Sequence, residues 1–293
     1  MSEMIKIAVD AMGGDNSPKK IVDGIIHHHK SNKDVYYKIF GDEIKISKLI
    51  DNKITKENFE IFNTLNKVSS EDSPLEGAKR GKDTSMWLAV ESVKKKDCDI
   101  VISAGNTGAL LVISKLNLKM IENIDKPALS ALWPNKKGMS VVLDLGANID
   151  CSSKNLFDFS IMGASLFKSL YPLQTTNVAL LNIGSEEFKG NETIKETFKI
   201  LKEKKIDDFN FKGYIEGNEL MNGNVNVIVS DGFTGNVALK TAEGTANFIT
   251  DELKKTLTGS IMGKISSLLN ISNLKKFKKR LDPRLYNLSL IHI

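Results

Sequence analysis

The chain has 293 residues, of which 41% are hydrophobic and 26% charged, and this composition is typical of a globular protein with a sizeable core. Its net charge of +5 is too small to indicate a nucleic-acid-binding protein, which would need its basic residues concentrated on one surface. The sequence has no signal-peptide pattern, no apolar run of membrane-spanning length and only two cysteines, Cys98 and Cys151, so we expect a reduced cytoplasmic protein.

Short apolar runs that end in polar turns alternate with segments of helical period along the chain. The apolar runs predict strands at residues 5–9, 35–40, 99–102, 140–143, 178–183 and 225–229. The helical period predicts helices at residues 85–95, 108–118 and 155–170. This alternation favours an α/β fold with a mostly parallel sheet covered on both faces, and the length allows one large domain or two smaller ones.

Polar, glycine-rich turns follow five of the predicted strands, at residues 10–15, 103–108, 144–148, 182–184 and 230–236. In parallel sheets, ligands bind at the carboxyl ends of the strands, where loops meet the first turns of helices. Because the five turns occupy similar positions after their strands, we expect them to contribute to one shared site.

The turn at 103–108 reads Ser-Ala-Gly-Asn-Thr-Gly and precedes a predicted helix. Glycine lets the backbone approach a ligand closely, and free N–H groups at a helix start favour an anion. Asn106 and Thr107 would add side-chain donors. The alternative is a tight turn with a helix cap and no ligand, and the spacing alone favours neither.

The turn at 230–236 repeats this arrangement after the strand at 225–229. Here Asp231 would orient a partner, while Thr234 and Asn236 would donate hydrogen bonds into the same cleft. Helix capping is again the alternative. Since each turn alone has a structural explanation, it is the presence of both that favours a phosphate or carboxylate site.

Lys189 follows the strand at 178–183 and stands close to Glu186 and Glu187. A lysine ammonium is a suitable counter-charge for phosphate. The usual fate of a lysine beside glutamates is a solvated surface pair, and the pattern alone favours that alternative.

Motifs for nucleotides, metals and nucleophilic catalysis do not fit the sequence. The glycines at 77–82 and 259–264 are one residue too close for a phosphate-binding P-loop, and no dinucleotide fingerprint follows the first strand. His27, His28 and His29 are consecutive, so on a helix they point in different directions. His292 is the only other histidine, so we expect neither a metal site nor a Ser-His-Asp nucleophile.

Residues 259–280 have apolar side chains at helical intervals with lysines between them. One interpretation is an ordinary helix that lays its apolar face on the core and leaves its lysines in water. The other is a surface that attaches to an anionic membrane or to an acidic protein partner. Amphipathicity alone does not distinguish the two.

Taken together and in order, the five turns resemble the phosphate acyltransferase family of bacterial phospholipid synthesis, which converts acyl-(acyl-carrier protein) and inorganic phosphate into acyl phosphate. The segments at 157–163, 213–216 and 281–284 also fit, so the resemblance spans about residues 4–287. It implies one Rossmann-like three-layer α/β/α domain over residues 1–287, of the isocitrate/isopropylmalate dehydrogenase type with a late helical hairpin.

The resemblance also implies partners. It implies a homodimer, and it implies that the basic amphipathic segment at 254–284 attaches to the anionic inner face of the cell membrane. The downstream glycerol-phosphate acyltransferase is a further expected partner, whereas nucleic acid is not.

On this basis the candidate catalytic residues are Asn106, Lys189 and Asn236. The residues expected to bind phosphate or the acyl thioester are Asp10, Gly13, Gly14, Ser103, Gly105, Thr107, Gly108, Asp144, Asn148, Asp231, Gly232 and Thr234. Those expected to contact the membrane or the carrier protein are Ile261, Ile265, Leu268, Lys275, Lys276, Lys279 and Arg280.

The chemistry expected of such a site requires no cofactor. Phosphate is already an anionic nucleophile, and a leaving thiolate with a pKa of about 8.5 needs little acid assistance. The site has to position phosphate and stabilise the oxyanion formed from the thioester carbonyl. Two alternatives stay open: a phosphotransacetylase that uses acyl-coenzyme A, and a non-catalytic module that binds acyl thioesters or membranes.

The end of the chain departs from the family pattern. After Tyr286 the family continues with a glycine-rich strand, a His-Gly turn and a closing helix, whereas residues 288–293 read Leu-Ser-Leu-Ile-His-Ile. We therefore expect a C-terminally truncated domain with an atypical tail, in which part of the sheet edge and core is exposed.

Overall fold

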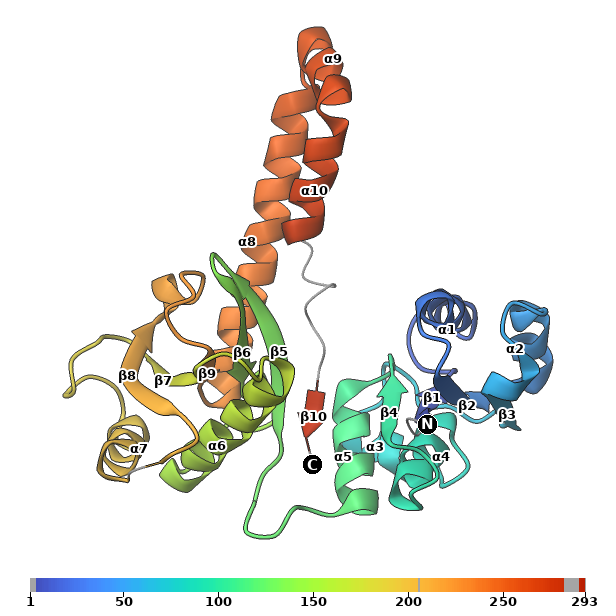
Figure 1. The fold of residues 1–293 in the computed structure, drawn as a ribbon, viewed down its shortest axis with the longest axis horizontal. Helices are drawn as coiled ribbons and strands as arrows, with labels where there is room; N and C mark the ends of the chain where they lie inside the picture. The colour runs from blue at the N-terminus through green and yellow to red at the C-terminus, as the bar shows by residue number, and fades with distance from the viewer. Residues whose placement is uncertain (1–3, 205, 282–289, 293) are drawn as a thin grey trace. The chain divides into compact units, whose positions relative to one another are not determined.

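The computed structural model describes residues 4–204, 206–281 and 290–292. The chain divides into two compact units, residues 4–122 (unit 1) and residues 123–292 (unit 2). Each has its own sheet and its own hydrophobic core (Figure 1).

Unit 1 is built on a four-stranded parallel sheet in the order β3-β2-β1-β4. Its strands are β1 (Ile5–Asp10), β2 (Val35–Gly41), β3 (Phe59–Asn63) and β4 (Ile100–Ser103). Its helices are α1 (Lys19–Ser31), α2 (Glu43–Ile50), α3 (Pro74–Lys79), α4 (Ser85–Lys94) and α5 (Thr107–Leu118), with a 3-10 turn at Lys56–Asn58.

Alternating side chains of the central strands of unit 1 enter separate core clusters. Val9 and Ile39 pack with residues of α1 and α2, whereas Ala8 and Phe40 pack with residues of α4. Since neighbouring residues of a strand point to opposite faces, these contacts show helices on both sides of the sheet. The carboxyl ends of β1 and β4 remain adjacent and open into the turns of the candidate site.

Unit 2 contains a six-stranded sheet in the order β10-β5-β6-β9-β7-β8. The four strands from β6 to β8 are parallel, while β5 runs antiparallel to both β6 and β10. The strands are β5 (Ala128–Asn135), β6 (Gly138–Leu143), β7 (Asn177–Asn182), β8 (Asn210–Glu216), β9 (Val227–Val229) and β10 (Leu290–His292). The helices are α6 (Ser153–Leu170), α7 (Glu192–Glu203), α8 (Gly232–Thr258), α9 (Ile261–Leu269) and α10 (Ile271–Leu281), with a 3-10 turn at Gly217–Glu219.

The sheet of unit 2 is also covered on both faces. Leu143 and Leu180 pack with Phe159 of α6 in one cluster, whereas Val142 and Leu181 lie in another cluster against the first turns of α8. The parallel strands β6, β9 and β7 are thus buried on both sides, and polar groups concentrate at their carboxyl ends.

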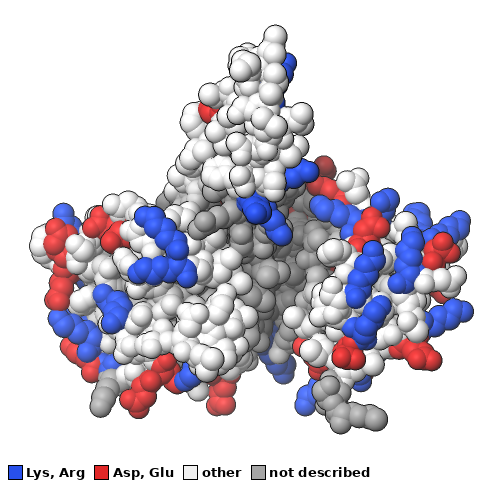
Figure 2. All heavy atoms as spheres, turned by 45° about the horizontal axis from the view of Figure 1, so that its top comes forward, with Lys and Arg blue, Asp and Glu red and all other residues white. Residues whose placement is uncertain are grey.

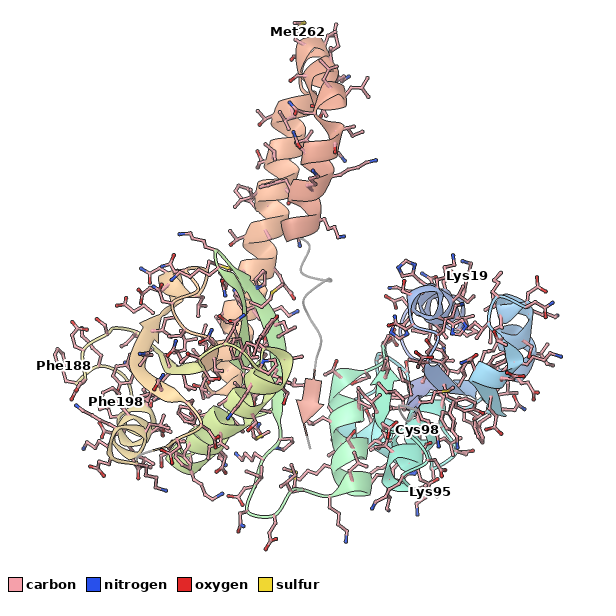
Figure 3. All side chains as sticks on the ribbon, in the orientation of Figure 1. Lys19, Lys95, Cys98, Phe188, Phe198 and Met262 are labelled. Carbon is pink, nitrogen blue, oxygen red and sulfur yellow. The ribbon has the colours of Figure 1, made fainter. Side chains whose placement is uncertain are left out.

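The segment α8–α10 continues beyond the sheet. The end of α8 contacts α9, where the Ser267 hydroxyl donates a hydrogen bond to the Leu257 carbonyl over 3.2 Å, and α10 runs back toward the sheet (Figure 1). Met262 lies at the tip (Figure 3), and the face of the segment seen in Figure 2 is mostly uncharged.

The exposure of the apolar side chains of this segment tests the first interpretation of residues 259–280, in which a helix lays its apolar face on the core. A helix packed on the core would bury them, but Ile261, Ile265 and Leu268 are 77%, 51% and 70% exposed. Lys275, Lys276 and Lys279 are exposed as well, and the side chain of Arg280 lies outside the described residues. The apolar face is therefore unpaired in the described chain.

The α/β class with parallel sheets agrees with the sequence-based expectation, but the strands form two sheets, not one. All six expected strands are present, and the expected helices at 85–95, 108–118 and 155–170 begin within two residues of their predicted starts. The segments at 282–284 and at 288, 289 and 293 lie outside the described residues, and 290–292 form β10. No helix in the described part of the chain is long and apolar enough to span a membrane.

Candidate functional site

The turns of unit 1 that follow β1 and β4 are tied together by Asp10. Its buried carboxylate accepts hydrogen bonds from the hydroxyls of Ser85 (2.6 Å) and Ser103 (2.7 Å) and from the Met12 N–H (3.2 Å). Burial raises the pKa of Asp10, and the two serine hydroxyls oppose that effect. Asp10 thus lies beneath the turns and joins them, and its side chain is not at the surface.

Two glycines after β1 allow these turns to touch. A Cβ at Gly13 would lie 2.8 Å from the backbone nitrogen of Gly105. Gly14 has φ +80°, and a Cβ there would collide with the Ala104 carbonyl oxygen. Any larger residue would separate the two turns, so the sequence pattern of the first turn reflects close backbone packing.

Asn106 is the N-cap of α5, as the capping alternative predicts. Its Oδ1 accepts the Ala109 N–H (3.0 Å), and its Nδ2 donates to the Asp72 carbonyl (2.7 Å). The N–H groups of Thr107 and Gly108 have no hydrogen-bond acceptor among the residues that the structure describes. The helix start therefore still offers backbone donors to an anion.

A cavity of about 230 Å³ opens beside these turns in unit 1. Lys20 is the cation in its lining and Asp15 the carboxylate. The Lys20 ammonium forms no ion pair within the described part of the chain. The lining consists of Gly14, Asp15, Lys20, Ile21, Ser70, Ala104, Gly105 and Asn106.

In unit 2 the turn after β6 is organised by Asp144. Its fully buried carboxylate accepts hydrogen bonds from the backbone N–H groups of Leu129 (3.0 Å), Gly146 (3.1 Å), Ala147 (3.0 Å) and Asn148 (2.8 Å). The Asn148 side chain donates to the same carboxylate over 2.7 Å. With both oxygens occupied, Asp144 shapes the turn.

The turn at the start of α8 packs directly on the Asp144 turn. The Gly232 N–H donates to the Asn148 carbonyl (2.8 Å), and Asn236 Nδ2 donates to the Leu145 carbonyl (3.1 Å). A Cβ at Gly235 would overlap the Asp144 carbonyl oxygen, so this close contact requires glycine.

Asp231 caps α8 and holds Thr234. One carboxylate oxygen accepts the Thr234 N–H (2.7 Å) and the other accepts the Thr234 hydroxyl (2.9 Å). Helix capping, the alternative to anion binding, is therefore observed at this turn and also at the turn of Asn106. Both predicted anion turns are capped helix starts, but they differ in their remaining donors: at α5 the N–H groups of Thr107 and Gly108 have no acceptor among the described residues, whereas at α8 the Gly232 N–H already donates to the Asn148 carbonyl.

Lys189 lies in a closed turn after β7. The buried Asn182 amide donates to the carbonyls of Gly184 (3.1 Å) and Lys189 (3.2 Å). The Lys189 ammonium lies 5.6 Å from the ring centre of Phe188, which is labelled in Figure 3. Among the described residues it has no carboxylate partner, and Glu187 pairs with Lys202.

A cavity of about 310 Å³ lies beside the α8 turn in unit 2. Among the residues that the structure describes, its lining has two carboxylates and no lysine or arginine. The Cys151 thiol faces it, and burial, with a smaller effect of the nearby Asp144 carboxylate, raises the pKa of that thiol to about 11. The lining is Ile149, Asp150, Cys151, Leu156, Asn191, Thr193, Ile194, Asp231, Phe233 and Thr234.

The five predicted turns therefore fall into two groups, two in unit 1 and three in unit 2. Asp10, Gly13, Gly14, Ser103, Gly105 and Asn106 come together in unit 1, and Asp144, Asn148, Asp231, Gly232, Thr234 and Asn236 come together in unit 2. Lys189 does not line the unit 2 cavity. Lys20, Ser70 and Asn191 line cavities but were missed, since no turn motif in the sequence marks them.

No group of three or more histidine, cysteine, aspartate or glutamate side chains in the described residues is arranged to hold a metal ion. The donors around both cavities are backbone N–H groups, amides, hydroxyls and Lys20. Such a donor set suits an oxyanion or a carbonyl oxygen.

Comparison with known proteins places the chain in a family. A family model described as "Fatty acid synthesis protein" matches residues 5–292. The phosphate acyltransferase of Pelagibacter ubique is 77% identical over 98% of this chain and 86% of its own length. The phosphate acyltransferase of Caulobacter vibrioides is 41% identical over 98% of this chain and 80% of its own. The chain belongs to the fatty acid synthesis protein family and is, like these relatives, a phosphate acyltransferase, which confirms the resemblance found in its sequence.

Solved structures similar to this family member include phosphotransacetylases. The EutD phosphotransacetylase from Staphylococcus aureus has a TM-score of 0.60 at 16% identity, covering 83% of this chain and 82% of its own. A phosphotransacetylase from Streptococcus pyogenes gives the same score and identity over 84% of this chain and 83% of its own. At this level of identity the likeness concerns the fold alone.

Proposed function

We propose that this phosphate acyltransferase of fatty acid and phospholipid synthesis forms acyl phosphate from acyl-(acyl-carrier protein) and inorganic phosphate. The observation that carries this proposal is the 77% identity, across 98% of the chain, to a relative with this activity in its name. The capped helix starts and the two cavities supply donors for the reaction, which in this mechanism needs no metal or cofactor.

In the proposed reaction a phosphate oxygen attacks the thioester carbonyl carbon, the carbon–sulfur bond breaks, and the carrier leaves as a thiolate. A thiol pKa of about 8.5 makes that thiolate a tolerable leaving group near neutral pH. The protein's role is to position phosphate and to donate hydrogen bonds to the carbonyl oxygen as it gains negative charge. A protonated Cys151 fits direct transfer to phosphate better than an acyl-cysteine intermediate.

We assign phosphate to the unit 1 cavity on the basis of charge. Lys20 and Asp15 balance each other in its lining, and the N–H groups of Thr107 and Gly108 lie at the adjoining helix start. The described lining of the unit 2 cavity, by contrast, carries the carboxylates of Asp150 and Asp231 and no lysine or arginine, and two carboxylates disfavour a dianion.

We assign the uncharged and apolar part of the acyl thioester to the unit 2 cavity. Ile149, Leu156, Ile194 and Phe233 supply apolar surface there. Asn236, on the same first turn of α8, and Lys189 remain our candidates for contact with the reacting groups. Lys189 is suited to this role because its ammonium has no carboxylate partner among the described residues.

The decisive test of the function is product formation from two donors. We expect acyl phosphate from acyl-(acyl-carrier protein) plus phosphate, and little from acyl-coenzyme A. Preferential use of the coenzyme A ester would instead identify a phosphotransacetylase. If neither donor gives acyl phosphate while the chain still binds the carrier protein, the chain is a non-catalytic binding module.

We further propose that α8–α10 attaches the protein to an anionic membrane surface, in the cytoplasm and beside the glycerol-phosphate acyltransferase that would use the product. Support comes from the exposed Ile261 and Leu268 and the exposed lysines of α10. Leu268→Asp should weaken binding to vesicles that contain phosphatidylglycerol, measured by flotation, by about thirtyfold, since burying a leucine contributes about 2 kcal/mol. The matched control is Ile44→Asp, which removes an equally exposed apolar side chain of unit 1.

The finer features of the fold also remain proposals. A continuous family match over residues 5–292 supports one acyltransferase domain over residues 1–287. We propose the isocitrate/isopropylmalate dehydrogenase type, with α8–α10 as its helical hairpin, and a homodimer as the functional state. Equilibrium sedimentation tests the last point, and a strictly monomeric species with full activity would contradict it.

A further inference from the structure

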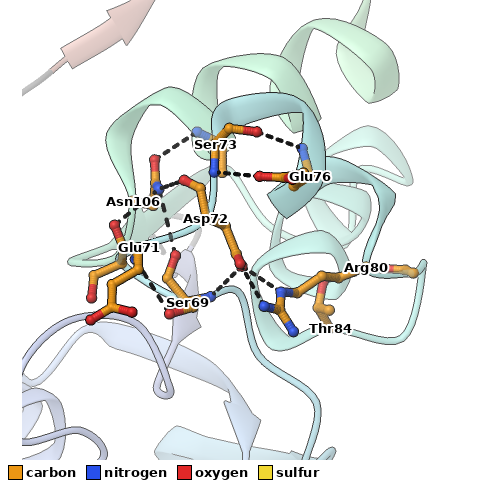
Figure 4. Close-up of polar contacts among 11 residues, drawn as sticks. Ser69, Glu71, Asp72, Ser73, Glu76, Arg80, Thr84 and Asn106 are labelled. Atoms are coloured by element: carbon orange, nitrogen blue, oxygen red, sulfur yellow. Dashed lines mark hydrogen bonds and ion pairs between the residues drawn. The ribbon is translucent and has the colours of Figure 1, made fainter.

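A bidentate ion pair lies next to the unit 1 cavity, in the segment between β3 and α4. The Arg80 guanidinium contacts both carboxylate oxygens of Asp72 through Nε and Nη2 (Figure 4). One of those oxygens also accepts the Ser69 N–H over 2.8 Å. The Asp72 carboxylate therefore closes the loop at 69–72 and anchors it to the end of α3. The Arg80 guanidinium lowers the pKa of Asp72, so this carboxylate stays ionised near neutral pH.

The same loop is attached to the turn at 103–108 through the backbone of Asp72. Its carbonyl oxygen accepts the Asn106 Nδ2–H over 2.7 Å, while Asn106 Oδ1 caps α5 (Figure 4). One amide side chain thus connects the loop to the start of α5, which adjoins the cavity proposed to hold phosphate. Both polar ends of that amide are engaged by the protein itself, which leaves it no free donor pair for a substrate.

Close packing of α3 on α5 supports this connection. A Cβ at Gly108 would lie 2.6 Å from Pro74 Cγ, and a Cβ at Gly77 would lie 2.8 Å from Ala109 Cβ. The loop carries Ser70, which lines the unit 1 cavity together with Asn106. A shift of the loop would therefore move both the cavity wall and the cap of α5.

We propose that Arg80, Asp72 and Asn106 form a brace that positions the phosphate-binding turn, with Arg80 and Asp72 as positioning residues that do not touch the substrate. This inference rests on the proposed function and on the assignment of phosphate to the unit 1 cavity. It changes the role of Asn106 from a group that contacts the reacting atoms to one that fixes the turn. Loosening the brace weakens phosphate binding and leaves use of the acyl donor unaffected.

The first experiment compares Arg80→Gln with Lys79→Gln. Lys79 is the preceding residue, is exposed and has no ion pair within the described residues, so its substitution removes the same charge without breaking the brace. We expect Arg80→Gln to raise the KM for phosphate about tenfold, with kcat and the KM for acyl-(acyl-carrier protein) within about twofold of wild type. Lys79→Gln should leave all three near wild type, and equal effects of the two substitutions would overturn the proposal.

A double-mutant cycle then separates a brace from two independent effects. If Arg80 acts through Asp72, the double variant Asp72→Asn/Arg80→Gln should raise the KM for phosphate no more than the worse single variant does. An effect equal to the product of the two single effects would contradict the proposal. Asn106→Ser keeps a good N-cap and loses the amide donor to Asp72, so it should show the same rise in KM.

A binding measurement keeps the brace testable apart from turnover. Inorganic phosphate should raise the melting temperature of the wild-type chain, and the increase should be smaller for Arg80→Gln and unchanged for Lys79→Gln. If phosphate stabilises the wild type more than Arg80→Gln but the wild type makes no acyl phosphate, the proposed function fails and the brace is supported as a device for phosphate binding. If Arg80→Gln is unfolded, Arg80→Lys, which keeps the charge and loses the two-pronged contact, replaces it in each measurement.

Discussion

The two candidate cavities are built from similar turns but differ in charge. In unit 1 the lining contains one cation, Lys20, and one carboxylate, Asp15, and the adjoining start of α5 has two N–H groups without a partner in the described chain. In unit 2 the lining carries Asp150 and Asp231, with four apolar side chains and a thiol. A glycine-rich turn at a helix start therefore does not define its ligand. The charge and polarity of the side chains that surround it do.

The largest effect that we expect is a loss of unfolding free energy when a Cβ is added to a closely packed glycine at the start of α8 or α5. In Gly235→Ala the new Cβ meets the backbone carbonyl of Asp144, which cannot move away, so we expect a loss of about 3 kcal/mol in unfolding free energy. In Gly108→Ala the obstacle is the ring of Pro74, and about 1 kcal/mol should be lost. Urea unfolding measures both.

The control for these two substitutions is Gly244→Ala in α8, where no atom lies within 4 Å of the new Cβ. This change should stabilise the chain by about 0.5–1 kcal/mol, because glycine is unfavourable inside a helix. If Gly235→Ala caused no loss of stability, the start of α8 would not be in close contact with the Asp144 turn. The helix starts in the two units would then tolerate an added Cβ equally well.

A smaller effect is expected from the charge of the unit 1 cavity. Lys20→Ala should raise the KM for phosphate about tenfold, which corresponds to about 1.4 kcal/mol for one charge-assisted hydrogen bond. Lys19→Ala is the matched control, since Lys19 pairs with Asp23 at 2.8 Å and does not line the cavity. Steady-state kinetics at varied phosphate concentration measures this KM. Equal KM values for the two variants would contradict the assignment of phosphate to the unit 1 cavity.

The smallest effect should come from the thiol of the unit 2 cavity. Because the pKa of Cys151 is raised to about 11, the thiol is protonated at neutral pH and gains nucleophilicity only as the pH approaches that value. Cys151→Ser should therefore keep activity within about threefold of wild type. Alkylation of Cys151 by iodoacetamide should be slow at pH 8 and accelerate toward pH 11. Rapid labelling at pH 7, together with an inactive serine variant, would indicate an acyl-cysteine intermediate instead.

Much of the fold follows from local sequence patterns. The runs at 5–9, 35–40 and 178–183 are strands because their residues are buried on both faces of a sheet, which produces continuous apolar stretches. Strands β3 and β8 lie at sheet edges and alternate between exposed and partly buried positions, so they lack that signal. β5 contains Pro134 close to its end, which weakens a strand pattern.

The candidate site could be predicted only in part. The turns were recognisable because glycines and capping residues sit at fixed positions after strands, and Asn106 and Asp231 are indeed the N-caps. Lys20 and Ser70 reach the cavity through tertiary contacts that no spacing in the sequence records. The pairing of Asp72 with Arg80 likewise joins residues eight positions apart across a short helix, where no periodic rule applies.

Helix α8 has a geometric consequence of its own. It runs without interruption through 27 residues, from the turn of Asp231 to Thr258, where α9 begins to form the apolar tip. At 1.5 Å per residue it is about 40 Å long. Its first turn contributes to the unit 2 cavity, and its other end carries the apolar tip. The length of α8 therefore fixes the distance between the cavity and the tip. Deleting seven residues, about two helical turns, would shorten the helix by about 10 Å while nearly preserving the direction of every side chain beyond the deletion.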